Sequence, residues 1–131
     1  MAAMRCRSRF DADKIKRKVN QGTFKSLNHA AAAIRLTARR SIRRSARKSL
    51  SGTPPHTRRG LLKRALLYKV EKTKLSAVIG PAYSIAGRSG RAHEFGGKYY
   101  GRDYPQRAFM GPALQANLKR VPKFWIHTVK Q

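Results

Sequence analysis

The sequence predicts an α+β domain in which a long N-terminal helix and a C-terminal helix pack on a small, mainly antiparallel sheet. Two stretches with apolar residues at helical spacing, 24–50 and 112–129, flank a middle region of strand-like alternation and frequent glycine. The length of 131 residues fits a single domain over 1–131. Within it, residues 1–10 are expected to form a flexible basic N-terminal arm.

Two helices separated by a short break are expected in the N-terminal part. Asp11 or Asp13 can cap a short helix that runs to about Val19. The segment 20–23, Asn-Gln-Gly-Thr, is typical of a turn, and a long helix then extends over Phe24–Leu50. Small side chains dominate its core-facing stripe, so each buries little area but lets another backbone approach closely. The stripe consists of Phe24, Leu27, Ala30, Ala31, Ile34, Ala38, Ser41, Ile42 and Ser45.

The opposite face of this long helix is strongly basic. Arg39, Arg43 and Arg47 recur every fourth residue, and Arg40 and Arg44 lie beside them. In an isolated helix each like-charge pair at this spacing costs about 0.2–0.5 kcal/mol. A polyanion would remove the repulsion, so the ridge is predicted to contact nucleic-acid phosphates without reading sequence. A solvated face that only maintains solubility is the other interpretation.

The middle of the chain is expected to supply the sheet. Pro and Gly within 51–57 end the long helix and begin a loop. Alternating apolar residues then predict strands over 66–71 and 75–80, joined by a short turn. Parts of 82–110, which is rich in glycine, are expected to add further strands between long loops.

A C-terminal helix is expected to begin at Gly111-Pro112, because the missing N–H of a proline is tolerated in the first turn. Pro122 should kink this helix or split it in two. The apolar stripe that would face the core is Leu114, Leu118, Val121, Trp125 and Val129.

The composition is extreme in charge and poor in large apolar residues. Lys and Arg number 31 against 5 Asp and Glu, which gives a formal net charge of +26. Leu, Ile, Val and Phe together make up 26 of the 131 residues, near the level below which highly charged chains stay disordered. Self-repulsion at this charge opposes compaction. We therefore expect contact with a polyanion, self-assembly, or both.

Several classes of protein are disfavoured by the same sequence. No apolar run approaches the roughly 18 residues that span a bilayer, so no membrane partner is expected. Cys6 is the only cysteine, which excludes an internal disulfide. The 5 carboxylates are scattered and the 4 histidines lack metal-ligand spacing, so no enzyme, catalytic residue, metal site or cofactor is expected. Glu94, beside His93, is instead predicted to anchor an arginine, within the chain or across a subunit boundary.

Two short motifs follow one another in the C-terminal half. The segment His93–Gly97 reads His-Glu-Phe-Gly-Gly, and Tyr104–Leu114 reads Tyr-Pro-Gln-Arg-Ala-Phe-Met-Gly-Pro-Ala-Leu. In this order they resemble a family of tailed-bacteriophage proteins, the minor tail, neck or tail-completion proteins of the head–tail junction. That family also has a long first helix, a Pro-Thr-Gly-Leu turn, a hairpin and a tyrosine. The matching residues here are Pro54, Pro55, Thr57, Gly60, Leu61 and Tyr83.

The chain departs from the family pattern at a few positions. Arg58-Arg59 separates Thr57 from Gly60, and the spacing from Tyr83 to Glu94 is long, so altered loops are expected. Ala108 stands where the family usually has proline, which affects where the last helix begins.

The resemblance implies a structural virion protein: a neck or tail-completion ring through which genomic DNA passes. The implied partners are other copies of the chain in a closed ring, adjacent head-closure or adaptor and tail-tube or tail-terminator proteins, and genomic DNA bound by nonspecific phosphate contact. Assembly would occur in the host cytoplasm and the mature location would be the virion. The arginine ridge would face either the DNA or an adjacent ring.

The resemblance also assigns roles to particular residues. Phe95 and Phe109 are expected to be at least half buried. Structural anchoring or a subunit interface is implied for Glu94, Phe95, Gly96, Arg107, Phe109, Pro112 and Leu114.

A ribosomal-type or other sequence-nonspecific RNA-binding protein is the alternative, since folding on RNA would also account for the charge and the small core. The segment 87–90, Gly-Arg-Ser-Gly, has the GxxG form with which KH domains clamp RNA. Because strand-like residues follow it, a flexible loop is the favoured interpretation. No aromatic residues interleave with the arginines of 39–47, so stacking on unpaired bases is not indicated.

Overall fold

A computed structural model describes residues 11–126, so the arm over 1–10 and Val129 lie outside the described residues. The elements, in chain order, are α1 (Ala12–Ser41), β1 (Arg43–Arg44), β2 (His56–Thr57), α2 (Leu61–Ala65), β3 (Leu66–Glu71), β4 (Ser76–Pro81), α3 (Tyr83–Ala86), α4 (Ser89–Phe95), β5 (Gly97–Tyr99), β6 (Arg102–Tyr104), α5 (Met110–Asn117) and the 3-10 helix η1 (Val121–Trp125).

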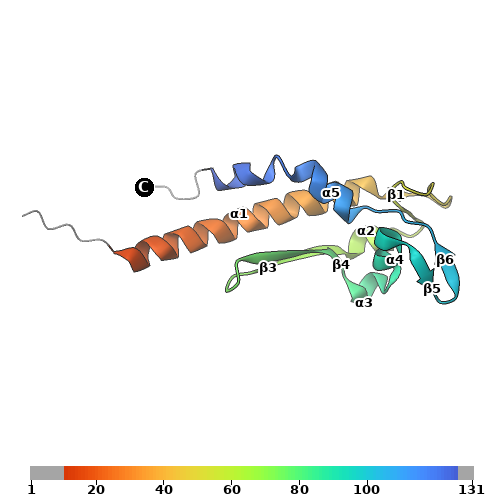
Figure 1. Cartoon of the computed structure of the whole chain (residues 1–131), viewed down its shortest axis with the longest axis horizontal. Coiled ribbons are helices and arrows are strands. Elements are labelled where there is room, and N and C mark those ends of the chain that lie inside the picture. Colours follow the sequence, from red (N-terminus) through yellow and green to blue (C-terminus); the bar gives the residue numbers. More distant parts are fainter. Residues whose placement is uncertain (1–10, 127–131) are drawn as a thin grey trace, which may run out of the picture.

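The long helix α1 is the axis around which the other elements pack. The β3–β4 hairpin contacts it on one side, and α5 and η1 contact it on the other (Figure 1). The short helices α3 and α4 and the β5–β6 hairpin lie towards the end of the molecule where α1 finishes (Figure 1). The predicted α+β class, with a long N-terminal helix and a C-terminal helix, is confirmed.

The strands form three separate two-stranded sheets rather than one. The β3–β4 hairpin is antiparallel, pairs Leu66 with Pro81 and Glu71 with Ser76, and confirms the hairpin predicted from alternating residues. The β5–β6 pair is also antiparallel, whereas β1 and β2 are parallel. Most of the stretch from 82 to 96, expected to hold strands and loops, instead forms α3 and α4.

Helix α1 is continuous through the segment 20–23, so the predicted break is wrong. Asp11 caps the helix as expected, its side chain accepting a hydrogen bond from the N–H of Lys14 at 3.0 Å. A glycine inside a helix costs about 1 kcal/mol. Gly22 and Ser26 lie on the buried face, and the Ser26 hydroxyl donates to the carbonyl of Phe124 at 2.7 Å. Packing against the C-terminal segment therefore outweighs the low helix propensity of Gly22.

The end of α1 also differs from the prediction, because the helix stops at Ser41 rather than Leu50. Ile42 is extended, with φ −83° and ψ 117°, and is completely buried. The next two residues pair with β2 in a parallel ladder. Burial of Ile42 and the ladder replace further helical turns, so the arginines of 39–47 do not form one helical ridge.

The core lies where α1, α2, β3 and α5 meet. The expected stripe of α1 is confirmed at its centre, where Ala30, Ala31, Ile34 and Ala38 are all buried. The fully enclosed cluster is small, and its members are Ile34, Ala38, Ile42, Leu62, Leu66, Phe109 and Ala113.

The C-terminal segment is split, as Pro122 predicted, and Val121 of the expected stripe packs against the core, but α5 buries a different face. Leu114 and Leu118 of the expected stripe are 45% and 49% exposed. Ala113 and Asn117 face the core instead. The Asn117 amide donates to the Thr37 hydroxyl at 2.9 Å and to the Ala113 carbonyl at 2.8 Å. A small side chain and a satisfied amide let α5 lie close to α1, where two leucines would hold it away.

Candidate functional site

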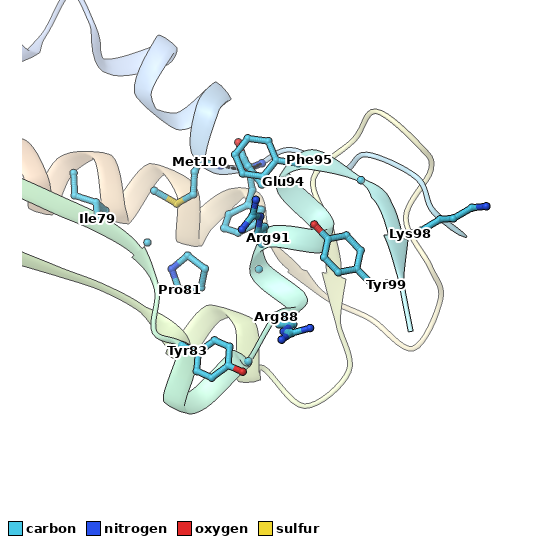
Figure 2. A pocket seen from close by; sticks show the side chains of 15 residues that line it. Ile79, Pro81, Tyr83, Arg88, Arg91, Glu94, Phe95, Lys98, Tyr99 and Met110 are labelled. Atoms are coloured by element: carbon cyan, nitrogen blue, oxygen red, sulfur yellow. Dashed lines mark hydrogen bonds between the residues drawn. The ribbon is translucent and has the colours of Figure 1, made fainter. Parts of the chain in front are cut away.

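Glu94 connects helix α4 to the start of helix α5 (Figure 2). Its Oε2 accepts hydrogen bonds from the N–H groups of Phe109 and Met110, both at 2.9 Å, and its Oε1 accepts one from Gly111 at 2.8 Å. The first N–H groups of a helix have no partner within it, and the helix dipole favours an anion there. Glu94 is thus an anchor, but to backbone N–H groups rather than to an arginine, and no ion pair joins it to an arginine within 11–126.

Gly96 and Arg107 hold the same junction together. Gly96 ends α4 with φ +66°, and a Cβ there would lie 3.0 Å from the Gln106 nitrogen and the Tyr104 carbonyl oxygen, so a side chain would be strained and crowded. The Arg107 N–H donates to the His93 carbonyl at 2.7 Å. Its Nε donates to the Ser49 carbonyl at 3.0 Å, which ties the loop after β1 to α4.

The two phenylalanines of the motifs have opposite environments. Phe109 is 1% exposed in the core, as expected. Phe95 is 70% exposed, so its predicted burial is wrong. Phe109 packs in the core cluster beside α1 and forms part of the inner wall of an open groove, whereas Phe95, at the end of α4, lines the same groove as an exposed side chain. Pro112 and Leu114, in the first turns of α5, are exposed.

The groove beside Phe95 has a volume of about 860 Å³ and is lined from β4, α3, α4, β5 and α5 (Figure 2). Tyr83, which is 71% exposed, and Phe95 lie along it with three exposed cations, Arg88, Arg91 and Lys98. Aromatic and basic side chains from one stretch of the chain, 83–98, therefore gather here. The sequence analysis did not predict this grouping, because it expected strands and long loops where α3 and α4 form.

The arginines predicted to bind phosphate form a cluster rather than a helical ridge. All five are exposed, and they come from the last turn of α1, from β1 and from the following loop. Arg40, Arg43 and Arg47 line one open groove of about 590 Å³ together with Lys48 and His56. No carboxylate lines it. We call this space, which Ser49 also lines, the arginine groove; Arg39 and Arg44 lie outside it.

The GxxG segment 87–90 links α3 to α4, and its Ser89 and Gly90 already form the first turn of α4, so the expectation that strands follow it is wrong. Gly90 is buried, and a Cβ built on it would overlap the ring of Pro81. Gly90 is therefore needed for packing, and the segment does not present two open glycines to a nucleic-acid backbone.

A smaller cavity of about 250 Å³ adjoins the arginine groove and shares Lys48, Ser49 and His56 with it. Ser49, His93 and Asp103 all line this cavity, and they are the residue types of a catalytic triad. However, Ser49 Oγ and His93 Nδ1 are buried without a hydrogen-bond partner among residues 11–126. The hydrogen bonds that define a triad are thus not formed through these atoms.

No family model, curated protein or solved structure matches this chain. Within residues 11–126, no group of three His, Cys, Asp or Glu side chains could hold a metal ion. No helix in this described part is long and apolar enough to cross a membrane.

Stability should depend on pH through His93. Burial and, secondarily, the charge of Arg107 lower the pKa of His93 below 6.5. The unfolded chain then binds this proton more tightly than the folded protein. The free energy of unfolding is therefore expected to fall as pH drops below about 6.5 and towards the lower folded-state pKa. Urea denaturation of the wild type and of His93→Gln across this range measures the effect, with His29→Gln as control. An equally steep decline in His93→Gln would contradict this origin.

Proposed function

We propose that this chain is a structural protein of the head–tail junction of a tailed bacteriophage, a neck or tail-completion protein that forms a closed ring around genomic DNA. The observation that carries the proposal is the contact made by Glu94. The motif His93–Gly97 and the motif Tyr104–Leu114, which together suggested the phage family, meet through the three hydrogen bonds of this carboxylate. Because one motif supplies the carboxylate and the other supplies the N–H groups that it binds, there is a physical reason for the two motifs to occur together.

Assembly into a ring is supported by the large apolar side chains that a single copy of the chain leaves exposed. The enclosed core is small, while Leu50, Val78, Tyr83 and Phe95 are each at least 70% exposed. Scattered exposed apolar residues are ordinary, but Tyr83 and Phe95 share one groove. Contacts with neighbouring copies, repeated head to tail and closing on themselves, would bury such surface. Adjacent head-closure or adaptor proteins and tail-tube or tail-terminator proteins are the proposed partners above and below, in the virion after assembly in the host cytoplasm.

The arginine groove is proposed to contact the phosphates of the passing DNA. Its cations come from three consecutive segments and have no carboxylate among them, so a polyanion relieves their mutual repulsion. Phosphate contacts of this kind position a protein on DNA without reading its bases. No catalytic step is proposed for the chain.

The triple variant Arg40→Gln, Arg43→Gln, Arg47→Gln tests this contact. Its affinity for duplex DNA should fall, and the slope of log K against log salt should become shallower by about 2–3 if each arginine contacts one phosphate. Fluorescence anisotropy with two duplexes of unrelated sequence measures both quantities.

The matched control is Lys14→Gln, Lys16→Gln, Lys18→Gln, which removes the same charge from exposed positions of α1. Equal losses in the two variants would mean that only net charge matters. In particles, failed genome retention with normal incorporation would support DNA contact. Failed incorporation would place the arginine groove at an adjacent ring instead, and normal results for both would leave it a solvated surface.

A ribosomal-type or other sequence-nonspecific RNA-binding protein remains the second candidate because of one observation. Exposed Tyr83 and Phe95 lie in a groove with Arg88, Arg91 and Lys98. Aromatic faces beside cations are the combination on which unpaired bases stack. The two candidates differ in the cellular particle with which the chain purifies.

A further inference from the structure

Two residues that line the small cavity beside the arginine groove each carry a buried polar atom that nothing in the described chain satisfies. Ser49 is only 7% exposed, and its Oγ has no hydrogen-bond partner within 11–126. The same is true of the buried Nδ1 of His93. Nearly all buried polar atoms in folded proteins are hydrogen-bonded, to protein, water or a bound ion. Two exceptions that line one cavity point to a ligand with hydrogen-bonding atoms.

The charged residues around this cavity indicate the sign of the ligand's charge. Lys48, Arg102 and Arg107 line it, and Asp103 is its single carboxylate. The Arg107 Nε donates to the Ser49 backbone carbonyl at 3.0 Å, which holds the guanidinium of Arg107 next to residue 49. This excess of positive charge, with the Ser49 hydroxyl as a hydrogen-bond donor on a lining residue, favours an anion.

We propose that this cavity binds a phosphate group. The ammonium, guanidinium, hydroxyl and imidazole groups belong to residues of three separate parts of the chain: the loop after β1, α4 and the β6 region. Such an arrangement suits a tetrahedral oxyanion better than a planar carboxylate, which one arginine can satisfy in a bidentate pair. A volume of about 250 Å³ limits the ligand to a small group or to one phosphate of a larger molecule.

The phosphate group can come from two sources that share this chemistry. Free phosphate or a terminal monoester can enter the cavity alone. A phosphodiester of a nucleic acid lying in the arginine groove can also reach it, because Lys48, Ser49 and His56 line both spaces. The site is separate from the proposed ring and stands even if the chain has no role in a virion.

Calorimetric titration of the full chain with inorganic phosphate, at ionic strength held constant with sodium chloride, tests the proposal. We expect one saturable site in the wild type. Ser49→Ala should weaken phosphate binding about fivefold, the effect of a neutral hydrogen bond, and Arg102→Gln about tenfold or more. The controls Ser51→Ala and Arg17→Gln make the same chemical changes at exposed positions outside the cavity and should bind as the wild type does.

Two further measurements separate a ligand site from general attraction to a basic protein. Backbone amide shifts on phosphate addition should concentrate at Ser49, His93 and Arg107. In phosphate-free buffer Ser49→Ala should be at least as heat-stable as the wild type, because it removes an unsatisfied buried hydroxyl.

The proposal is overturned if the wild type has no saturable site, if Ser49→Ala and Arg102→Gln bind like their controls, or if acetate binds as well as phosphate. A loss of heat stability in Ser49→Ala without phosphate would also overturn it. Dimethyl phosphate identifies the source: binding of this diester supports a nucleic-acid backbone, and binding of inorganic phosphate alone supports a free phosphate or monoester. Failure here leaves the DNA and virion tests of the proposed function unaffected, since those do not involve Ser49.

Discussion

Replacing Phe109 by alanine is expected to lower the free energy of unfolding by about 3–5 kcal/mol. Phe109 is 1% exposed and is the largest of the fully buried side chains within 11–126. It packs with residues of α1, α2, β3 and α5, so its loss opens a cavity among four elements. Urea denaturation followed by circular dichroism measures the change. Because the enclosed core has few other members, this single truncation should remove a large share of the stability.

Phe95→Ala is the matched control, since it deletes the same ring from a position that is 70% exposed. Its effect on unfolding should stay within about 0.5 kcal/mol. Comparable destabilisation by the two variants would show that the motif phenylalanines have the same environment, contrary to the structure.

Phe109→Asp, which buries an unpaired charge, should prevent incorporation into particles.

Replacing Glu94 by alanine is expected to lower the free energy of unfolding by about 2 kcal/mol. The carboxylate satisfies three N–H groups at the start of α5, and alanine leaves them without that acceptor. Glu94→Gln keeps one acceptor oxygen and loses the charge, so it should cost about half as much. Thermal and urea unfolding measure both variants.

Any lost carboxylate raises the net charge of a chain that already carries +26, so this experiment needs a charge-matched control. Glu71→Ala provides it. Glu71 is exposed and pairs with Lys74 at 3.8 Å, an interaction worth at most about 0.5 kcal/mol. Equal destabilisation by Glu71→Ala and Glu94→Ala would mean that net charge, rather than the cap on α5, explains the loss.

The parts of the fold predicted from the sequence are those fixed by neighbouring residues. Alternation over 66–80 is a local signal, and the β3–β4 hairpin follows it. The helical stripe around Ile34 is equally local. The end of α1 was missed because the parallel pairing of Arg43 with His56 joins residues far apart in sequence. The continuation through Gly22 was missed because it depends on packing against the C-terminal segment.

The candidate site was predictable only in part, for the same reason. Glu94 stood out as one of few carboxylates, and an arginine was its expected partner among so many. Composition does not show which backbone N–H groups lie at the start of a helix. The three N–H groups that donate to Glu94 were therefore not predicted. Ser49 has no local sequence signal, and the motif that contains His93 does not indicate that the two residues meet. Arg107 donates hydrogen bonds to the backbone carbonyls of both, and all three line one cavity.

The most direct test of the proposed head–tail role is where the chain is found in cells that produce the phage. Quantitative mass spectrometry of purified tailed particles and of ribosomal fractions from the same lysate measures this. The proposal predicts a small, fixed number of copies per particle, located by antibody labelling at the junction of head and tail, and none enriched on ribosomes. Absence from purified particles together with enrichment on ribosomes would contradict it and would favour the RNA-binding alternative.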